Sequence, residues 1–217
     1  MLIADDEELT RTGLRTLLSA KPQLDVVGEA ADGTEVVPLV AKLRPDVVLM
    51  DVRMPGMDGI EATRRLRAEL DEPPKVVVIT TFESDQYVYE ALRAGADGFV
   101  LKRAPSDRIA RAVHLVATDD SLLFPDAVRR LVTARPASAV PPLPLPLTGR
   151  EQDTLRLMAK GLSNPEIAQR LVVSLETVKT HVSNVLMKLE AQNRTQAVVM
   201  AYESGLVVPG EDYVSNG

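Results

Sequence analysis

Short apolar runs alternate with longer amphipathic segments over the first half of the chain. In the longer segments the apolar residues recur with helical spacing, whereas the short runs have the length of buried strands. Five such strand–helix units in succession predict an α/β domain, with a parallel five-stranded sheet covered by helices on both faces. The expected strands are residues 1–4, 25–30, 46–50, 75–80 and 98–102, and the expected helices are residues 7–20, 34–44, 59–70, 84–95 and 106–118. Pro38 is expected to kink the second helix or to mark its first turn.

The second half of the chain has a different character. A short helical segment, residues 124–134, precedes a segment with five prolines, residues 135–146, which favours an extended, semi-rigid spacer. Beyond it the pattern predicts a small all-α domain of four helices, of which the second has Asn164 as its expected N-cap. The expected helices are residues 148–161, 164–171, 173–189 and 193–205. The chain is therefore divided into one domain at 1–118, a linker at 119–146, a second domain at 147–210 and a tail at 211–217.

Composition excludes several classes of protein. The 217 residues are 45% hydrophobic, which is enough for two cores, and they include no cysteine, which excludes disulfides and thiolate metal sites. Only two histidines occur, His114 and His181, too far apart in sequence to indicate a histidine-rich metal site. No apolar run has the length of a membrane span and no basic-then-apolar leader is present, so a soluble cytoplasmic protein is expected. The net charge of −6 argues against indiscriminate nucleic-acid binding, but it permits a local basic surface.

Three carboxylates fall at the ends of two predicted strands. Asp5 and Asp6 follow the first strand, and Asp51 follows the third. In a sheet of this topology the first and third strands are neighbours, so all three acids should crowd one corner of the carboxyl edge. Their mutual repulsion calls for a positive partner, either a divalent cation or Lys102, which ends the fifth strand. A site of carboxylates without imidazole or thiolate suits Mg²⁺ or Mn²⁺.

This edge has the chemistry to handle a phosphoryl group. Lys102 and a hard metal would neutralise phosphoryl oxygens, and Thr80, at the end of the fourth strand, would donate a hydroxyl hydrogen bond. Asp51 is the candidate nucleophile, since a carboxylate can attack phosphorus covalently. The alternative is that each Asp only caps the turn after its own strand. Matched residues at four strand ends favour the functional interpretation.

Four motifs carry a resemblance to the receiver domain of two-component response regulators. They are ADDEE, LMDVRMPGMDGIE, VVVITT and GFVLK, which occur in the receiver order within residues 1–118. The resemblance implies a flavodoxin-like (βα)5 fold and a Mg²⁺-dependent phosphorylation site. By this resemblance Asp51 is the phosphoacceptor, and Asp5 and Asp6 form the acidic pocket, in which the backbone carbonyl of Arg53 also binds the metal.

The resemblance assigns further roles beyond the acids. Lys102 matches the essential lysine, Thr80 the hydroxyl residue that follows the phosphoryl group, and Phe99 the aromatic residue that changes rotamer with it. The chain departs from the common pattern in its short first strand and in Arg103, which stands where many receivers have proline. A haloacid-dehalogenase-like phosphatase would need a second Asp two residues after Asp51, where this chain has Arg53. We therefore expect no enzyme for external substrates, only self-phosphotransfer and slow self-dephosphorylation.

The second and third helices predicted in the C-terminal domain suggest a DNA-binding motif. Residues 164–171 and 173–189 form two helices joined by a short link, the layout of a helix-turn-helix. The outward face of the second helix of this pair carries polar residues suited to base edges and phosphates. These residues are Lys179, Thr180, Ser183, Asn184 and Lys188. Residues 147–217 hold seven Lys/Arg and eight Asp/Glu, so they are almost neutral. Charge alone therefore leaves a small helical bundle for protein docking as an equal alternative.

A second resemblance favours DNA binding. LTGREQDTLRLMAKGLSNPEIAQRLVVSLETVKTHVSNVLMKL, followed by NRTQAVV, resembles the LuxR/NarL-type helix-turn-helix over nearly its whole length. The resemblance places Lys179, Thr180 and Ser183 at bases, and Thr177, His181 and Lys188 near phosphates. The last helix, at 193–205, resembles the dimer-forming helix of the family, although packing on its own domain explains its apolar residues equally well.

Together the two resemblances identify the chain as a member of the NarL/FixJ family of response regulators. They imply a sensor histidine kinase and double-stranded promoter DNA as partners, a homodimer on phosphorylation, and RNA polymerase as a further candidate partner. The rival interpretation is a constitutive DNA-binding protein whose receiver serves only for dimerisation. The complete set of acids, threonine and lysine argues against that rival.

Overall fold

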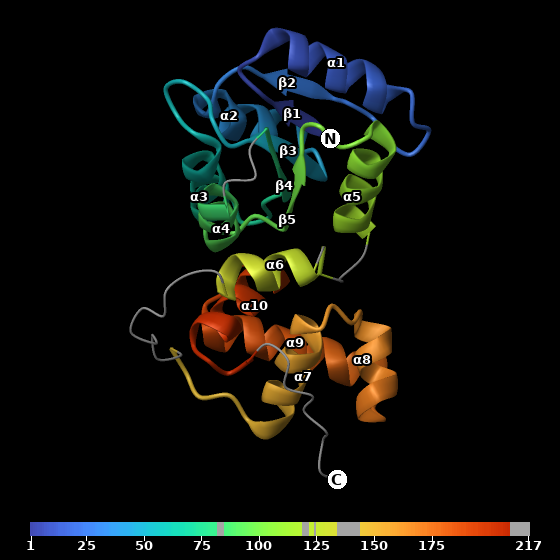
Figure 1. Cartoon of the computed structure of the whole chain (residues 1–217), viewed down its shortest axis with the longest axis vertical. Coiled ribbons are helices and arrows are strands. Elements are labelled where there is room, and N and C mark those ends of the chain that lie inside the picture. The colour runs from blue at the N-terminus through green and yellow to red at the C-terminus, as the bar shows by residue number, and fades with distance from the viewer. Residues whose placement is uncertain (82–84, 119–121, 124, 134–143, 209–217) are drawn as a thin grey trace. The chain divides into compact units, whose positions relative to one another are not determined.

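The computed structural model describes residues 1–81, 85–118, 122–123, 125–133 and 144–208 (Figure 1). The chain divides into two compact units, Met1–Asp119 and Asp120–Gly217. Each unit has its own apolar core, and each is described separately below.

The N-terminal unit contains a five-stranded parallel sheet in the order β2-β1-β3-β4-β5. Its strands are β1 (Leu2–Ala4), β2 (Gly28–Ala30), β3 (Val47–Asp51), β4 (Lys75–Thr80) and β5 (Gly98–Leu101). This confirms the α/β class and the parallel five-stranded sheet. The strand predicted at 25–30 is shorter than expected, because the pairing with β1 begins at Leu2 and Gly28, and before it the Val27 N–H bonds the carbonyl of Met1, the first residue.

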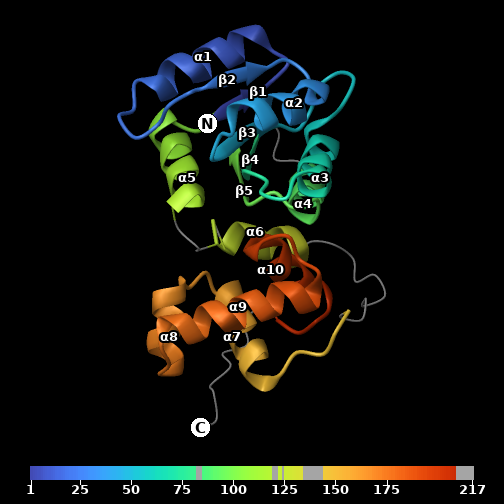
Figure 2. The ribbon, with the colours of Figure 1, turned by 180° about the vertical axis from the view of Figure 1, so that it is seen from behind.

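Five helices cover the sheet on two faces. They are α1 (Glu8–Ser19), α2 (Gly33–Leu43), α3 (Gly59–Glu69), α4 (Asp85–Arg93) and α5 (Ser106–Thr118). Helices α1 and α5 pack together on one face, and α2, α3 and α4 line the other (Figures 1 and 2). Burial on both faces explains why β3 and β4 read as unbroken apolar runs. Pro38 lies inside α2 rather than in its first turn.

In the C-terminal unit, all regular secondary structure among the described residues is helical. Its helices are α6 (Pro125–Thr133), α7 (Gly149–Ala159), α8 (Asn164–Leu171), α9 (Leu175–Leu189) and α10 (Arg194–Glu203). Helix α6, which the sequence assigned to the linker, packs against α10, and its Val128 is fully buried. The start of α6 also lies close to the turn after α7, because a Cβ on Gly161 would come within 2.7 Å of Pro125 Cγ. The apolar side of α6 thus extends the core of this unit.

Two helix starts show how capping defines this unit. A capping box begins α7, since Thr148 accepts from the Glu151 backbone and the Glu151 carboxylate accepts from the Thr148 backbone. The prediction that Asn164 caps α8 is wrong by one residue. Ser163 is the N-cap, and both its backbone N–H and its hydroxyl donate to the Glu166 carboxylate at 2.7 Å. Asn164 is instead buried and accepts a hydrogen bond from Arg194, which ties α8 to α10.

Glu151 also joins α7 to α9. Its carboxylate is 4% exposed and accepts a hydrogen bond of 2.7 Å from Lys188 Nζ. Burial raises the pKa of Glu151, but the hydrogen bonds from Lys188 and Thr148 outweigh it, and the net pKa is lowered from 4.5. A lowered carboxyl pKa stabilises the folded state above the unfolded value, and this stabilisation is lost as the pH falls through the folded value.

Glu151→Gln is therefore expected to remove one acid-sensitive component of stability. In the wild type the free energy of unfolding should fall as the pH drops below about 4.5, and the variant should lack part of that fall. At neutral pH the variant should be less stable by on the order of 3 kcal/mol, because Lys188 loses its charged partner. Urea unfolding followed by circular dichroism at several pH values measures both effects. Glu190→Gln, at an exposed C-cap, is the control, and equal pH profiles for the two variants would contradict the assignment.

Candidate functional site

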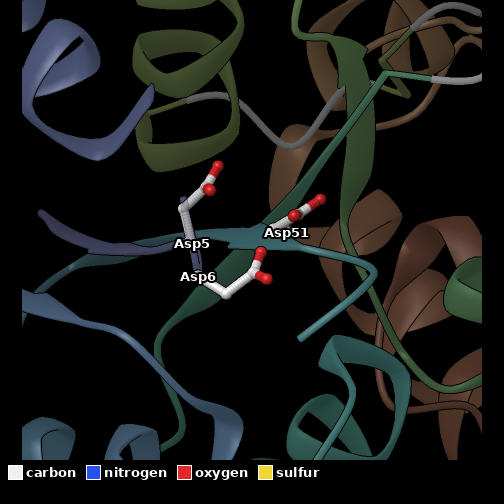
Figure 3. Close-up of side chains that lie close together, drawn as sticks. All are labelled: Asp5, Asp6 and Asp51. Atoms are coloured by element: carbon white, nitrogen blue, oxygen red, sulfur yellow. The ribbon is translucent and has the colours of Figure 1, made fainter. Parts of the chain in front are cut away.

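The carboxyl edge of the sheet gathers the three acids that the sequence indicated. Strands β1 and β3 are paired neighbours, with Ala4 opposite Met50, so Asp5 and Asp51 emerge side by side. Asp51 is the last residue of β3 rather than the first residue after it, and Asp5 and Asp51 are buried whereas Asp6 is exposed. One carboxylate oxygen from each acid lies within 4.8 Å of the others (Figure 3).

Lys102 bridges two of these acids. Its Nζ lies 2.7 Å from Asp5 Oδ2 and 2.9 Å from Asp51 Oδ2. Burial lowers the pKa of Lys102, but the two carboxylates outweigh it and raise the pKa above its ordinary value. Burial raises the pKa of Asp51, and the hydrogen bond from Lys102 only partly offsets this effect. Lys102 therefore stays charged and holds the carboxylates of β1 and β3 together.

Local backbone bonds account for only part of the acids' geometry. Asp5 Oδ1 accepts from the Glu7 N–H at 3.0 Å, and Asp51 Oδ1 accepts from the Val52 N–H at 2.8 Å, as the capping alternative requires. The second oxygen of each acid points instead to Lys102. Among the described residues, Asp5 Oδ2 is a buried oxygen with this ion contact but no well-formed hydrogen bond. Three clustered carboxylates with spare oxygen lone pairs fit a hard divalent cation such as Mg²⁺.

The other two predicted receiver residues lie on β4 and β5. Thr80 ends β4 and is buried, and its carbonyl accepts from the Lys102 N–H at 2.8 Å. Phe99 lies in β5 opposite Val78 and is partly exposed. The structure thus places Thr80 at the same edge as the acids, and Phe99 on the adjacent strand.

Arg53 has a partner that the sequence did not indicate. Its guanidinium donates to the Tyr87 hydroxyl at 2.9 Å and lies 4.9 Å from the centre of the Tyr87 ring. The pair links the loop after β3 to α4, over a separation of 34 residues that no local pattern encodes.

Helices α8 and α9 pack as the predicted pair in the C-terminal unit. Ser174 caps α9, and Val178, Val185 and Leu189 are fully buried on its inner face. The opposite face presents polar side chains, as the sequence indicated. Of these, Lys179, Thr180 and Ser183 are exposed, whereas Thr177, His181 and Asn184 are partly exposed.

The two lysines of α9 have different surroundings. Lys179 Nζ lies 3.0 Å from the Glu176 carboxylate, and both side chains are more than half exposed, so this ion pair is weak and exchangeable. Lys188 is less exposed and is bound to buried Glu151. Lys188 therefore has a structural partner within the unit, whereas Lys179 is open to an external one.

Comparisons with known proteins agree with both units. Residues 1–114 match the model of the response regulator receiver domain, and residues 145–201 match that of the luxR family of bacterial regulatory proteins. The chain belongs to the NarL/LuxR family of two-component response regulators. As a response regulator with a receiver and a LuxR-type helix-turn-helix, it is a DNA-binding regulator of transcription, and the family is one of regulators rather than of classical enzymes.

Full-length relatives support this assignment. The response regulator is 41% identical over 208 residues to the transcriptional regulatory protein LiaR of Bacillus subtilis, covering 95% of this chain and 98% of LiaR. It is equally 41% identical over 207 residues to the response regulator protein VraR of Staphylococcus aureus, with the same coverage of both chains.

Solved structures give the same result. The response regulator ChrA of a heme-sensing two-component system matches with a TM-score of 0.52 and 33% identity, over 95% of this chain and 97% of ChrA. RcsB of Salmonella typhimurium matches with a TM-score of 0.54 and 26% identity, over 94% of this chain and 97% of that chain.

Within the described residues, no helix has the length and apolar character needed to cross a membrane.

Proposed function

We propose that this response regulator accepts a phosphoryl group on Asp51 from a sensor histidine kinase, and that phosphorylation controls dimerisation and sequence-specific DNA binding. The observation that carries the proposal is the bridge from Lys102 to Asp5 and Asp51, at 2.7 and 2.9 Å, beside three convergent carboxylates. Three carboxylates beside a single lysine leave an excess of negative charge, which a divalent cation at this corner would offset.

In the proposed reaction a carboxylate oxygen of Asp51 attacks the phosphorus of a phosphohistidine. The new O–P bond forms as the P–N bond breaks, and the departing imidazole takes up a proton. Lys102, already beside the attacking carboxylate, attracts the phosphoryl oxygens as they arrive. Asp5, Asp6, Asp51 and the backbone carbonyl of Arg53 would hold Mg²⁺ or Mn²⁺, which supplies positive charge for those oxygens. Slow attack by water on the acyl phosphate returns the free carboxylate.

The phosphoryl group would then change the surface of the receiver. The Thr80 hydroxyl moves to bond the phosphoryl oxygen, and Phe99 changes rotamer on the neighbouring strand. This shift biases the face formed by α4, β5 and α5 towards dimerisation. The dimer presents two copies of α9 to promoter half-sites about one DNA turn apart in the cytoplasm, where RNA polymerase is the further partner.

The test uses the purified full chain, a small-molecule phosphodonor and Mg²⁺. The expected result is an acid-labile phosphoryl group on the intact protein, together with a larger dimer fraction and tighter binding to promoter DNA. The rival function, a constitutive DNA-binding protein with a receiver used only for dimerisation, predicts no label and unchanged DNA binding. Absence of label under all donor concentrations would overturn the proposal.

Lys179→Ala tests the DNA-binding face. The side chain is exposed on α9, and loss of a base or phosphate contact is expected to weaken binding by about 1–3 kcal/mol, or roughly 5- to 150-fold. Fluorescence anisotropy with promoter DNA at fixed physiological salt measures this change. Lys42→Ala removes the same charge from an exposed position of α2 and is expected to change affinity little. If the two variants bind DNA with equal affinity, the assignment of α9 as the helix that contacts DNA bases is wrong.

A further inference from the structure

The loop between β3 and α3, residues 52–58, contains a tight turn. The Met57 N–H donates to the Pro55 carbonyl at 2.8 Å, which closes a γ-turn around Gly56. Gly56 has a φ of 71°, in the left-handed region that glycine adopts readily and other residues rarely.

Asp32, on a different element, lies directly against this turn. It is the N-cap of α2, and its Oδ1 accepts from the Thr34 N–H at 2.8 Å. A Cβ on Gly56 would lie only 2.6 Å from Asp32 Oδ2, so the carboxylate rests on the bare α-carbon of Gly56. The hydrogen bond of Thr34 lowers the pKa of Asp32, and the backbone N–H of Met57 adds to this effect. One carboxylate thus serves both the start of α2 and the γ-turn.

A second close approach brings α2 and the loop together. A Cβ on Gly33, the first residue of α2, would come within 2.4 Å of the Met57 carbonyl oxygen. Only glycine allows the main chains to approach this closely at Gly33 and Gly56. Glycines on α2 and in the loop therefore both contribute to this close contact, and Asp32 lies beside them.

The loop is held at its other end as well. The Gly59 N–H donates to the Val52 carbonyl at 3.0 Å, and the Arg53 side chain is bound to Tyr87 of α4. The backbone of Arg53 lies between these anchors and the braced turn at Gly56. A shift of the turn would therefore be transmitted to the Arg53 carbonyl.

We propose that Asp32 is a positioning residue of the phosphorylation site, whose carboxylate braces the γ-turn at Gly56 and so fixes the main chain that carries the Arg53 carbonyl. This inference rests on the proposed function, in which that carbonyl helps to hold the divalent cation. Asp32 touches neither the cation nor the phosphoryl group and acts through the loop. Loss of such a supporting contact typically weakens metal binding by about 10- to 100-fold.

Asp32→Ser separates bracing from capping. Serine is as good an N-cap as aspartate, so α2 keeps its cap, but its hydroxyl is too short to serve Thr34 and the γ-turn together. Asp58→Ser is the matched control, because Asp58 caps α3 at the end of the same loop and accepts from the Glu61 N–H at 2.7 Å. Among the described contacts, that of Asp58 is with its own helix alone.

The experiment measures Mn²⁺ binding to the unphosphorylated full chain by the electron paramagnetic resonance signal of free Mn²⁺. Asp32→Ser is expected to bind about 10-fold more weakly than the wild type, and Asp58→Ser about equally to it. In amide NMR spectra without metal, the Gly56 and Met57 signals should shift in Asp32→Ser while the α2 signals stay. In phosphorylation assays the Mg²⁺ concentration for half-maximal rate should rise, with the rate at saturating Mg²⁺ retained.

Two outcomes are distinguishable. Wild-type affinity for Mn²⁺ in Asp32→Ser, with unshifted Gly56 and Met57 signals, would overturn the positioning role while leaving the phosphorylation site intact. A wild-type chain that binds Mn²⁺ but is never phosphorylated would overturn the proposed function, and the metal-binding comparison would still decide the role of Asp32.

Discussion

Asp51→Asn is expected to abolish phosphorylation of the chain entirely. The amide has the size of the carboxylate and can still accept from the Val52 N–H through its oxygen, so the end of β3 keeps its geometry. The amide nevertheless lacks the negative oxygen that attacks phosphorus, and it loses the ion pair with Lys102. We expect no detectable phosphoryl group on the variant, and DNA binding that no longer responds to the phosphodonor.

Intact-protein mass spectrometry after incubation with phosphodonor and Mg²⁺ measures this loss. Asp6→Asn provides the contrast, because Asp6 belongs to the same acidic cluster but is exposed and is not the proposed nucleophile. That variant should still be labelled, at a lower rate and with a higher Mg²⁺ requirement. Undiminished label on Asp51→Asn would show that another group accepts the phosphoryl.

Gly59→Ala is expected to have the largest effect on stability. Gly59 is the first residue of α3, and a Cβ there would lie 1.9 Å from the Asp51 carbonyl oxygen and 2.8 Å from Met50 Cγ. The first of these contacts is with backbone, which cannot rotate away, so α3 or the end of β3 has to move. We expect a loss of more than about 4 kcal/mol, enough to unfold a receiver of ordinary stability or to displace Asp51.

Gly13→Ala is the matched control for this steric effect. Gly13 also lies in a helix, α1, but nothing lies within 4 Å of its would-be Cβ. Alanine there should stabilise the unit by about 0.5–1 kcal/mol, because it favours the helix and restricts the unfolded chain. Urea unfolding of both variants gives the comparison. If Gly59→Ala is as stable as Gly13→Ala, the steric clash expected at position 59 is contradicted.

Much of the acidic site proposed for phosphorylation could be predicted because it depends on strand ends. In a parallel sheet every strand delivers its carboxyl end to one edge, so the positions of Asp5, Asp51, Thr80 and Lys102 after apolar runs were enough to bring them together. The details of helix starts were harder, since Ser163 and Asn164 are both good caps. Burial of Asn164 against Arg194 decided between them, and that burial depends on a helix 30 residues further along the chain.

The sequence by itself determined the parallel sheet and the acidic corner, because periodicity and strand ends are local properties. Only the tertiary structure decided which side chains meet across long separations. It placed Lys188 on Glu151, α6 on α10, and Asp32 on Gly56. These contacts depend on the packing of whole elements and on the close approach that glycine permits, and no pattern within one segment encodes them.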